Sequence, residues 1–95
     1  MPSQISGTVV EISPSGDLIT DISADRLRGV PRDERVTVRC DEHETQGIFG
    51  AGHSEPACTF LALLGERGVL ELVIVGESAA IMLGVRRGEA VTVTW

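Results

Sequence analysis

The chain has 95 residues, a net charge of −6 and 42% hydrophobic residues, a composition typical of one globular domain and not of a disordered chain. Fourteen acidic residues against eight basic ones would repel phosphate backbones and anionic membrane surfaces, and three aromatic residues offer little surface for stacking bases. Nucleic acid and membranes are therefore not expected among its partners.

Short segments rich in β-branched residues and bounded by turn residues predict an all-β fold. The predicted strands are residues 5–12, 18–22, 35–40, 45–49, 58–64, 69–75 and 91–95. A spacing of about ten residues between such strands is typical of sandwiches and barrels. We therefore predict a small closed Greek-key barrel of about seven strands with one short helix, formed by residues 1–95 as a single domain.

The first two predicted strands form a hairpin. Gly7, inside the first strand, marks either a β-bulge or a close approach of two backbones. Pro14 suits the second position of a tight turn and Gly16 the fourth, so the chain returns as a partner strand. Ser23 can then cap a single helical turn over residues 23–27.

Residues 69–75 form the most hydrophobic segment and predict a central strand covered on both faces. Glu71 interrupts this segment, and a buried carboxylate there would need an ion pair or hydrogen bonds at a barrel rim. The second apolar face must be covered by the barrel itself or by a neighbour, which is one reason to expect self-association. Beyond this strand, Ser78 predicts the cap of a short helix that Gly84 ends.

Every cysteine and histidine falls between positions 40 and 58, in two close pairs: Cys40 with His43, and His53 with Cys58. These residue types bind zinc, but their spacing matches no common zinc finger. Cys40 and Cys58 occupy apolar strand positions, so the simpler interpretation is two buried thiols and two loop histidines. His53 could be a general base, yet no nucleophile is identified by spacing, so a one-domain hydrolase is the least favoured hypothesis.

The remaining signals are general. Residues 1–6 have neither a basic nor an apolar leader pattern, and no apolar run is long enough to span a membrane, which predicts a cytoplasmic protein. Asp17, Asp21 and Asp25 follow at intervals of four and could bind a hard cation, although turns and strand ends explain them without a ligand. No cofactor is predicted.

Two segments resemble a known family. GDLITDI, residues 16–22, is similar to the F-G-N-L-I-T-N-I signature in the C-terminal domain of the S-adenosylmethionine hydroxide adenosyltransferases, relatives of the fluorinase and chlorinase. Residues 68–93 resemble the closing segment of that domain, with its G-Y-L-E-I-A-V strand, G-S-A-A helix, L-G-x-x-x-G-D turn and terminal V-x-V strand. The resemblance covers residues 5–95 and implies a closed Greek-key barrel, with the family's catalytic chemistry in a larger N-terminal domain.

The positions that the resemblance assigns to ligand contacts differ from the family pattern. Ser15 stands where the family has an aromatic residue that packs on the nucleoside, and Asp17 where an Asn reads the adenine edge. Glu66 falls near a small polar residue that meets the methionine end, and Arg67 resembles a carboxylate-binding residue of some members. Asp17 lacks the amide donor, and Glu66 would repel a carboxylate, so we expect an inherited fold with an altered ligand site.

Three hypotheses follow for function. The first is a non-catalytic β-barrel binding or interaction module that associates with itself or with another protein. The second is one half of a split S-adenosylmethionine-hydrolysing enzyme, which would bind an adenosyl nucleoside in trans with a separate catalytic domain. The third is a small zinc-binding protein that uses Cys40, His43, His53 and Cys58.

Overall fold

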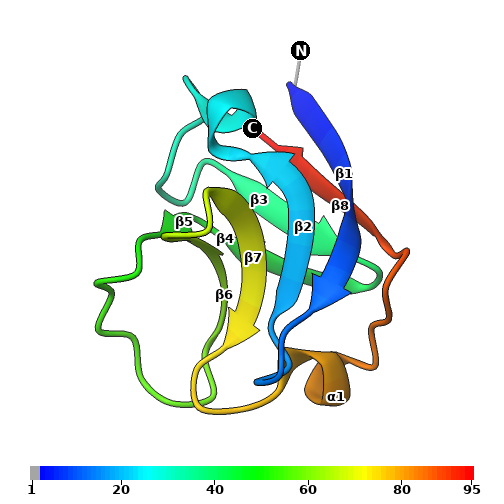
Figure 1. The fold of residues 1–95 in the computed structure, drawn as a ribbon. Helices are drawn as coiled ribbons and strands as arrows, with labels where there is room; N and C mark the ends of the chain where they lie inside the picture. The colour runs from blue at the N-terminus through cyan, green and yellow to red at the C-terminus, as the bar shows by residue number, and fades with distance from the viewer. Residues whose placement is uncertain (1–2) are drawn as a thin grey trace.

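The computed structural model describes residues 3–95 and shows an eight-stranded sheet that is nearly closed into a barrel (Figure 1). The strands are β1 (Gln4–Ile12), β2 (Leu18–Ser23), β3 (Thr37–Cys40), β4 (His43–Gln46), β5 (Ile48–Phe49), β6 (Phe60–Leu64), β7 (Val69–Ile74) and β8 (Ala90–Thr94). Their order in the sheet is β4-β3-β8-β1-β2-β7-β6-β5, and the helical elements are the 3-10 turn η1 (Ala24–Leu27) and the helix α1 (Ala79–Leu83). The predicted all-β class with one short helix is confirmed.

The structure has one strand more than the sequence predicts, because the segment 45–49 is divided. Gly47 lies between β4 and β5 with φ of +88°, a left-handed conformation that turns the chain. β4 therefore pairs antiparallel with β3, whereas β5 pairs parallel with β6. The hydroxyl of Thr45 on β4 donates to the carbonyl of Phe60 on β6 at 3.0 Å, so a side chain links the two ends of the sheet.

The first hairpin has the predicted form. β1 pairs antiparallel with β2 and, on its other edge, with β8. The register of the hairpin shifts between Val9 and Glu11, so the irregularity is not at Gly7 itself. At Gly7 a Cβ would overlap Cγ1 of Ile22 and lie 2.6 Å from Oδ1 of Asp21. Gly7 is thus required by a close approach of two strands, which was one of its two predicted roles.

The core is built on the inner face of β7, as predicted. Leu70, Leu72 and Ile74 belong to the buried cluster that fills the barrel. Apolar side chains of other strands and turns complete it, among them Leu18, Ile22, Leu27, Val36, Val38, Cys40, Val91 and Val93. Trp95 packs against this cluster, and its backbone exchanges hydrogen bonds of 2.8 and 3.0 Å with Ser3, so the last strand closes onto the start of the first.

The outer face of β7 is buried as well. Val73 points away from Leu72, pairs with Leu61 on β6, and is 7% exposed, while Leu61 is fully buried. Ile19 on β2 is 6% exposed and pairs with Glu71 on the same face. The prediction that β7 is covered on both faces is confirmed, and this face is buried within a single chain, so it supplies no argument for self-association.

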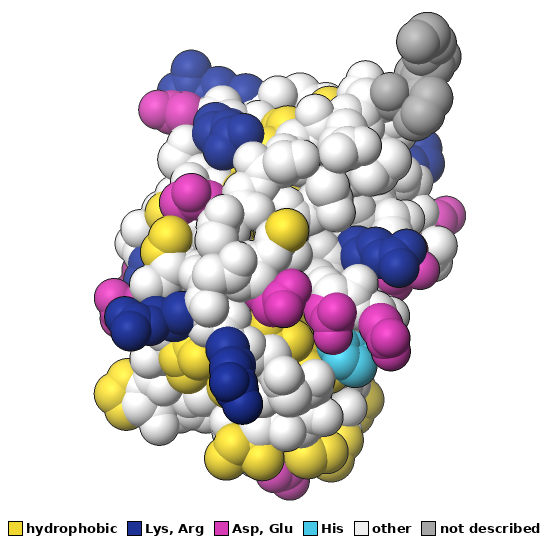
Figure 2. Space-filling view, turned by 90° about the vertical axis from the view of Figure 1, so that its right-hand side faces the viewer, with side chains coloured by type: hydrophobic (Ala, Val, Ile, Leu, Met, Phe, Trp, Pro, Cys, Tyr) yellow, Lys and Arg dark blue, Asp and Glu magenta, His cyan; other side chains and the backbone are white. Residues whose placement is uncertain are grey.

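The helix α1 begins and ends as the sequence predicts. The Oγ of Ser78 accepts a hydrogen bond from the Ile81 amide at 3.2 Å, and Gly84 has φ of +68° at the other end. Ala79 packs into the core, whereas Ile81 and Met82 are 81% and 60% exposed. Figure 2 shows hydrophobic side chains gathered at the lower end of the molecule, where Figure 1 places α1. The helix therefore carries an exposed apolar surface.

Candidate functional site

A cavity of about 490 Å³ opens on the outer side of the barrel, where the turn between β1 and β2 meets the turn between β7 and α1. Ser15 and Asp17 form one wall, and residues 76–78 form another. His53, from the loop between β5 and β6, forms a third, and the floor includes Leu63 and Val73. A volume of this size is within the range of pockets that hold small organic ligands.

The wall formed by the first turn is held by hydrogen bonds around Ser13. The Gly16 amide donates to the Ser13 carbonyl at 2.8 Å, and the Asp17 amide donates to the Ser13 hydroxyl at 3.0 Å. Gly16 has φ of +90°, and its carbonyl accepts from the Ala80 amide at 2.9 Å, so the turn is fastened to the start of α1. Apart from the Ser13 hydroxyl, these bonds use backbone groups, so the Asp17 carboxylate takes part in none of them, and Asp17 lines the cavity.

The opposite wall follows from the way in which β7 ends. Gly76 adopts φ of +78°, and the Glu77 amide donates to the Ile74 carbonyl at 3.0 Å, which turns the chain toward the helix. Glu77 is exposed at this turn, while Ser78 is occupied in capping α1. A tight turn directly after a buried strand thus places Glu77 at the cavity that Asp17 also lines.

His53 is held in one orientation. Its Nδ1 accepts a hydrogen bond from the Glu55 amide at 3.1 Å, so in the neutral ring the proton is on Nε2. The ring meets Phe49 edge to face, with centroids 6.3 Å apart and planes at 76°. His53 therefore offers the cavity an apolar ring with one donor.

Of the carboxylates near the outer face of β7 and the cavity, only that of Glu71 has an arginine beside it within residues 3–95. Glu71 is 4% exposed, and Nε of Arg67 lies 3.6 Å from its Oε1, the ion pair that the sequence required for this residue. Burial raises the pKa of the Glu71 carboxyl, the Arg67 charge opposes this rise, and the charge of Asp17 adds to it. Within residues 3–95, neither Asp17 nor Glu77 has an ion-pair partner, so the cavity end of this face is acidic.

Of the four residues predicted from the family resemblance, two meet at the cavity. Ser15 and Asp17 line it, whereas Glu66 and Arg67 belong to the turn between β6 and β7 and do not. Arg67 contacts Glu71 instead. His53 enters the site through loop packing that has no sequence signature. Glu77 was missed too, although the glycine after the central strand could have indicated a turn beside it.

The structure places the predicted zinc residues in different surroundings. Cys40 is buried in the core and pairs with His43 across β3 and β4, while His43 Nε2 lies 3.0 Å from the Leu83 carbonyl. Cys58 is exposed with φ of +68°, so its prediction as a buried thiol is wrong: it precedes β6 in a turn. Among the residues that the structure describes, no group of three or more His, Cys, Asp or Glu side chains could hold a metal ion.

Burial and nearby charges keep the Cys40 thiol protonated. Burial is the main cause that raises the pKa of this thiol to about 11, and the carboxylates of Glu89 and Asp41 contribute. The thiolate is the form that binds metals and attacks electrophiles. Cys40 therefore behaves as a small core hydrophobe, as the sequence indicated.

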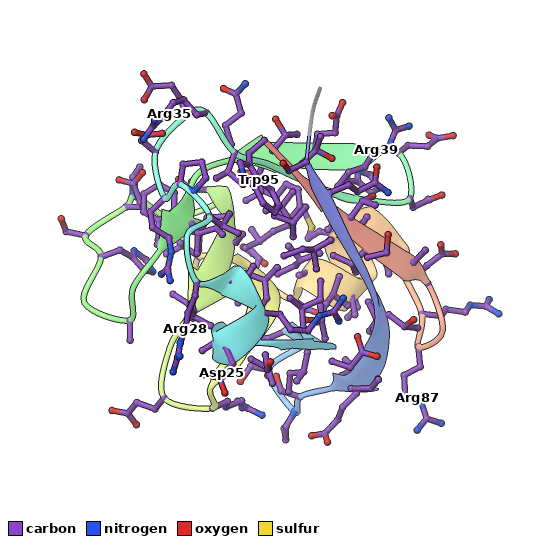
Figure 3. All side chains as sticks on the ribbon, turned by 90° about the horizontal axis from the view of Figure 1, so that it is seen from above. Asp25, Arg28, Arg35, Arg39, Arg87 and Trp95 are labelled. Atoms are coloured by element: carbon purple, nitrogen blue, oxygen red, sulfur yellow. The ribbon has the colours of Figure 1, made fainter. Side chains whose placement is uncertain are left out.

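The three evenly spaced aspartates have separate roles. Asp21 Oδ1 accepts a hydrogen bond from the Thr8 amide at 2.9 Å, which supports the pairing of β1 and β2. Asp25 forms an ion pair with Arg28 at 3.0 Å on the surface of η1, where Figure 3 shows the two side chains close together. Only Asp17 lines the cavity, so within residues 3–95 the three carboxylates do not form a shared cation site.

The fold and the cavity define a small β-barrel domain with an open, acidic pocket on its outer face. The chain belongs to the family of SAM hydroxide adenosyltransferase C-terminal domains, which it matches over residues 7–92. The resemblance seen in the sequence is thereby confirmed.

Two solved structures illustrate the similarity. An uncharacterized conserved protein from Thermotoga maritima superposes with a TM-score of 0.76 at 23% identity, over 95% of this chain and 35% of its own. A conserved hypothetical protein from Thermus thermophilus gives a TM-score of 0.68 at 20% identity, over 93% of this chain and 32% of its own. These likenesses show the fold, and the chain spans about a third of the length of either protein.

No curated protein matches the sequence. In residues 3–95, none of the helices is both long enough and apolar enough to cross a membrane.

Proposed function

We propose that this chain is a non-catalytic binding module whose ligand site is the cavity between the first hairpin turn and the start of α1. The observation that carries the proposal is the position of Ser15 and Asp17. Both line the cavity, and both stand at positions that the resemblance assigns to nucleoside contacts. A preformed concave site with an apolar floor and a few polar groups is the usual form of a small-molecule site.

The arrangement of polar groups favours binding over chemistry. His53 is the imidazole at the cavity, and its Nδ1 is engaged by the Glu55 amide. Within residues 3–95, no hydrogen bond joins His53 to Ser15 or Ser78, the pairing that would activate a hydroxyl nucleophile. Ser78 is committed to the helix cap, so the polar groups are suited to holding a ligand.

An adenosyl nucleoside is the first ligand to test. A thermal-shift titration with adenosine and with S-adenosylmethionine should raise the melting temperature, because a ligand that binds only the folded state stabilises it by mass action. The rise should disappear in Val73→Trp, which fills the floor of the cavity, and persist in Glu66→Gln, outside it. Absence of any rise at millimolar ligand would refute the proposed site.

The second candidate is one half of a split S-adenosylmethionine-hydrolysing enzyme. The chain spans about a third of the two solved relatives, so a partner could supply the rest of such an architecture. Arg67 is half exposed, and besides its contact with Glu71 it could meet a ligand shared with that partner. Nucleoside binding that appears only when a catalytic-domain partner is added would favour this candidate over the free-standing module.

Self-association is a further part of the proposal. The contact surface we propose is the helix α1 and not the second face of β7, which the sequence had indicated. The outer face of β7 is buried within the chain, whereas Ile81 and Met82 on α1 are exposed side by side. Contact between two copies through α1 would cover this apolar surface. Light scattering at high protein concentration should show a dimer that Ile81→Ser weakens, and a strictly monomeric protein would contradict it.

A further inference from the structure

We infer that residues 51–57, in the loop between β5 and β6, form a strap that opens as a unit from the outer face of β6 and β7, with His53 as its latch. Figure 1 and Figure 3 both show this loop on the outside of the barrel. The opening goes beyond the proposed function, because it belongs to the protein without a ligand.

The strap reaches both ends of the outer face of β6. A Cβ on Gly65, the residue after β6, would lie 3.5 Å from the Cβ of Ala51. At the opposite end, a Cβ on Gly76, shortly after β7, would lie 4.0 Å from the Cβ of Ala57. Because β6 and β7 are antiparallel, these two contacts lie at opposite ends of the strand pair. The strap therefore follows the pair along its length.

Buried apolar side chains lie on the face that the strap follows. Leu61 and Val73 are buried and pair across β6 and β7, yet neither belongs to the cluster that fills the barrel. Val73 lines the cavity together with Leu63 and His53, which places the imidazole of the strap at this face. Opening of the strap would expose these side chains and leave the inner core packed.

Few polar contacts hold the strap to the barrel. Within residues 3–95, no hydrogen bond or ion pair joins residues 51–57 to a strand. Their hydrogen bonds stay inside the loop, as between the His53 amide and the Gly50 carbonyl at 3.1 Å. The next connection to the barrel is at Cys58, whose amide donates to the Val75 carbonyl at 2.7 Å. The strap can therefore leave the surface without breaking a hydrogen bond of the sheet.

His53 is the side chain that fastens the strap. Ser54 and Pro56 are exposed, whereas the His53 ring is half-buried and meets Phe49 of β5 edge to face. Its Nδ1 also accepts from the Glu55 amide, so the same ring anchors the strap and fixes its shape. Loss of this ring would remove both contacts at once.

Opening would also change the cavity. His53 forms one of its walls, so a lifted strap removes that wall and widens the way to Val73 on the floor. Loops that open and close over a site control the entry and release of ligands in many proteins. This role as a gate rests on the proposed function, whereas the opening itself does not.

The test places a thiol beneath the strap and measures its rate of alkylation by iodoacetamide. The reporter is Leu61→Cys, combined with Cys58→Ser to remove the exposed natural thiol. Cys40, buried in the core, remains as the thiol that opening of the barrel would expose. With each rate divided by that of the same thiol in denaturant, we expect the reporter to react about tenfold faster than Cys40, or more, because local opening costs less free energy than global opening.

Three further variants separate the strap from the barrel. His53→Ala should raise the reporter rate about tenfold, whereas Ser54→Ala, a matched change at an exposed neighbour, should leave it unchanged. Val93→Ala, in the core, should raise the Cys40 rate about tenfold or more and leave the reporter rate unchanged. The reason is that a weaker core affects the closed and the strap-open forms equally.

The outcomes decide between local and global opening. Equal scaled rates for the two thiols, or a reporter rate that rises with Val93→Ala in step with Cys40, would overturn the inference. A reporter rate that His53→Ala leaves unchanged would overturn the role of His53 as the latch. Each measurement uses the protein without a ligand, so the strap can fail while the ligand site stands, and the reverse.

A second measurement needs no reporter thiol and covers the case in which Leu61→Cys does not fold. It is hydrogen exchange at the Glu55 amide of the natural protein, which donates to His53. We expect its rate to be unaffected by low concentrations of denaturant, because opening of the strap exposes little surface. A rate that rises with denaturant in step with core amides such as that of Val93 would overturn the inference.

Discussion

A Gly16→Ala variant is expected to lose about 3 kcal/mol or more of unfolding free energy, because two separate costs fall on one residue. Gly16 has φ of +90°, which a side chain makes unfavourable. The added Cβ would also overlap Oγ of Ser78 and come within 2.8 Å of its Cα. Since a backbone atom is involved, a rotation of the serine side chain cannot relieve the contact, and the hairpin turn must separate from α1.

Gly29→Ala is the matched control for this substitution. Gly29 also has a left-handed backbone, with φ of +80°, but a Cβ there would meet no atom within 4 Å. It should lose only about 1 kcal/mol, from backbone strain alone. Chemical denaturation of both variants measures the difference, and equal losses would show that the turn does not pack on the helix as described.

An Arg67→Ala variant is expected to lose about 1–2 kcal/mol of unfolding free energy at pH 7 and almost none at pH 4. Arg67 is the charge that opposes the burial of Glu71, whose side chain is 6% exposed. We expect this loss of unfolding free energy to be small because the Arg67 side chain is itself 48% exposed, so solvent screens the ion pair. Arg28→Ala breaks a pair that is over 80% exposed on both sides and should change stability little at either pH.

The pH dependence follows from the sign of the pKa change. Burial raises the pKa of Glu71 in the folded protein above its ordinary value of 4.5. At a pH between the ordinary pKa of the unfolded chain and the raised pKa of the folded protein, Glu71 has lost its proton in the unfolded chain but keeps it in the folded one. Rising pH therefore favours unfolding. Glu71→Gln should therefore be more stable than the natural protein near pH 7, with the difference vanishing below pH 4.5. A difference that stays constant with pH would contradict a buried, ionised Glu71.

Much of the fold could be predicted because local signals and burial agree. The apolar segment around Leu72 could only be a central strand, and Ser78 and Gly84 delimit the helix by their own backbone and side-chain chemistry. The hairpin turn at Gly16 was indicated in the same way. At Gly47, by contrast, one glycine inside the segment 45–49 was compatible with a strand. Its left-handed backbone goes with hydrogen bonds from the amides of residues 47 and 48 to the Val36 and Arg32 carbonyls, which separate β4 from β5.

The candidate site was predictable only in part. Ser15 and Asp17 were found because they lie in a turn with a family signature. The placement of His53 and the exposure of Cys58 depend on how the loop before β6 folds over the barrel, and no periodicity encodes that path. Arg67 was assigned to a ligand, whereas the structure uses it to neutralise Glu71, a contact that requires knowledge of the turn geometry.

The central claim is that this domain binds a ligand in the cavity beside Asp17. The most direct test is a titration of the ¹⁵N-labelled protein with adenosine, followed by amide chemical shifts. We predict saturable shifts at Asp17, Gly76 and Glu77, on both cavity walls, with little change around Cys40 in the core. Saturable shifts centred instead on the turn at Arg67, or no saturable shift at all, would contradict the claim.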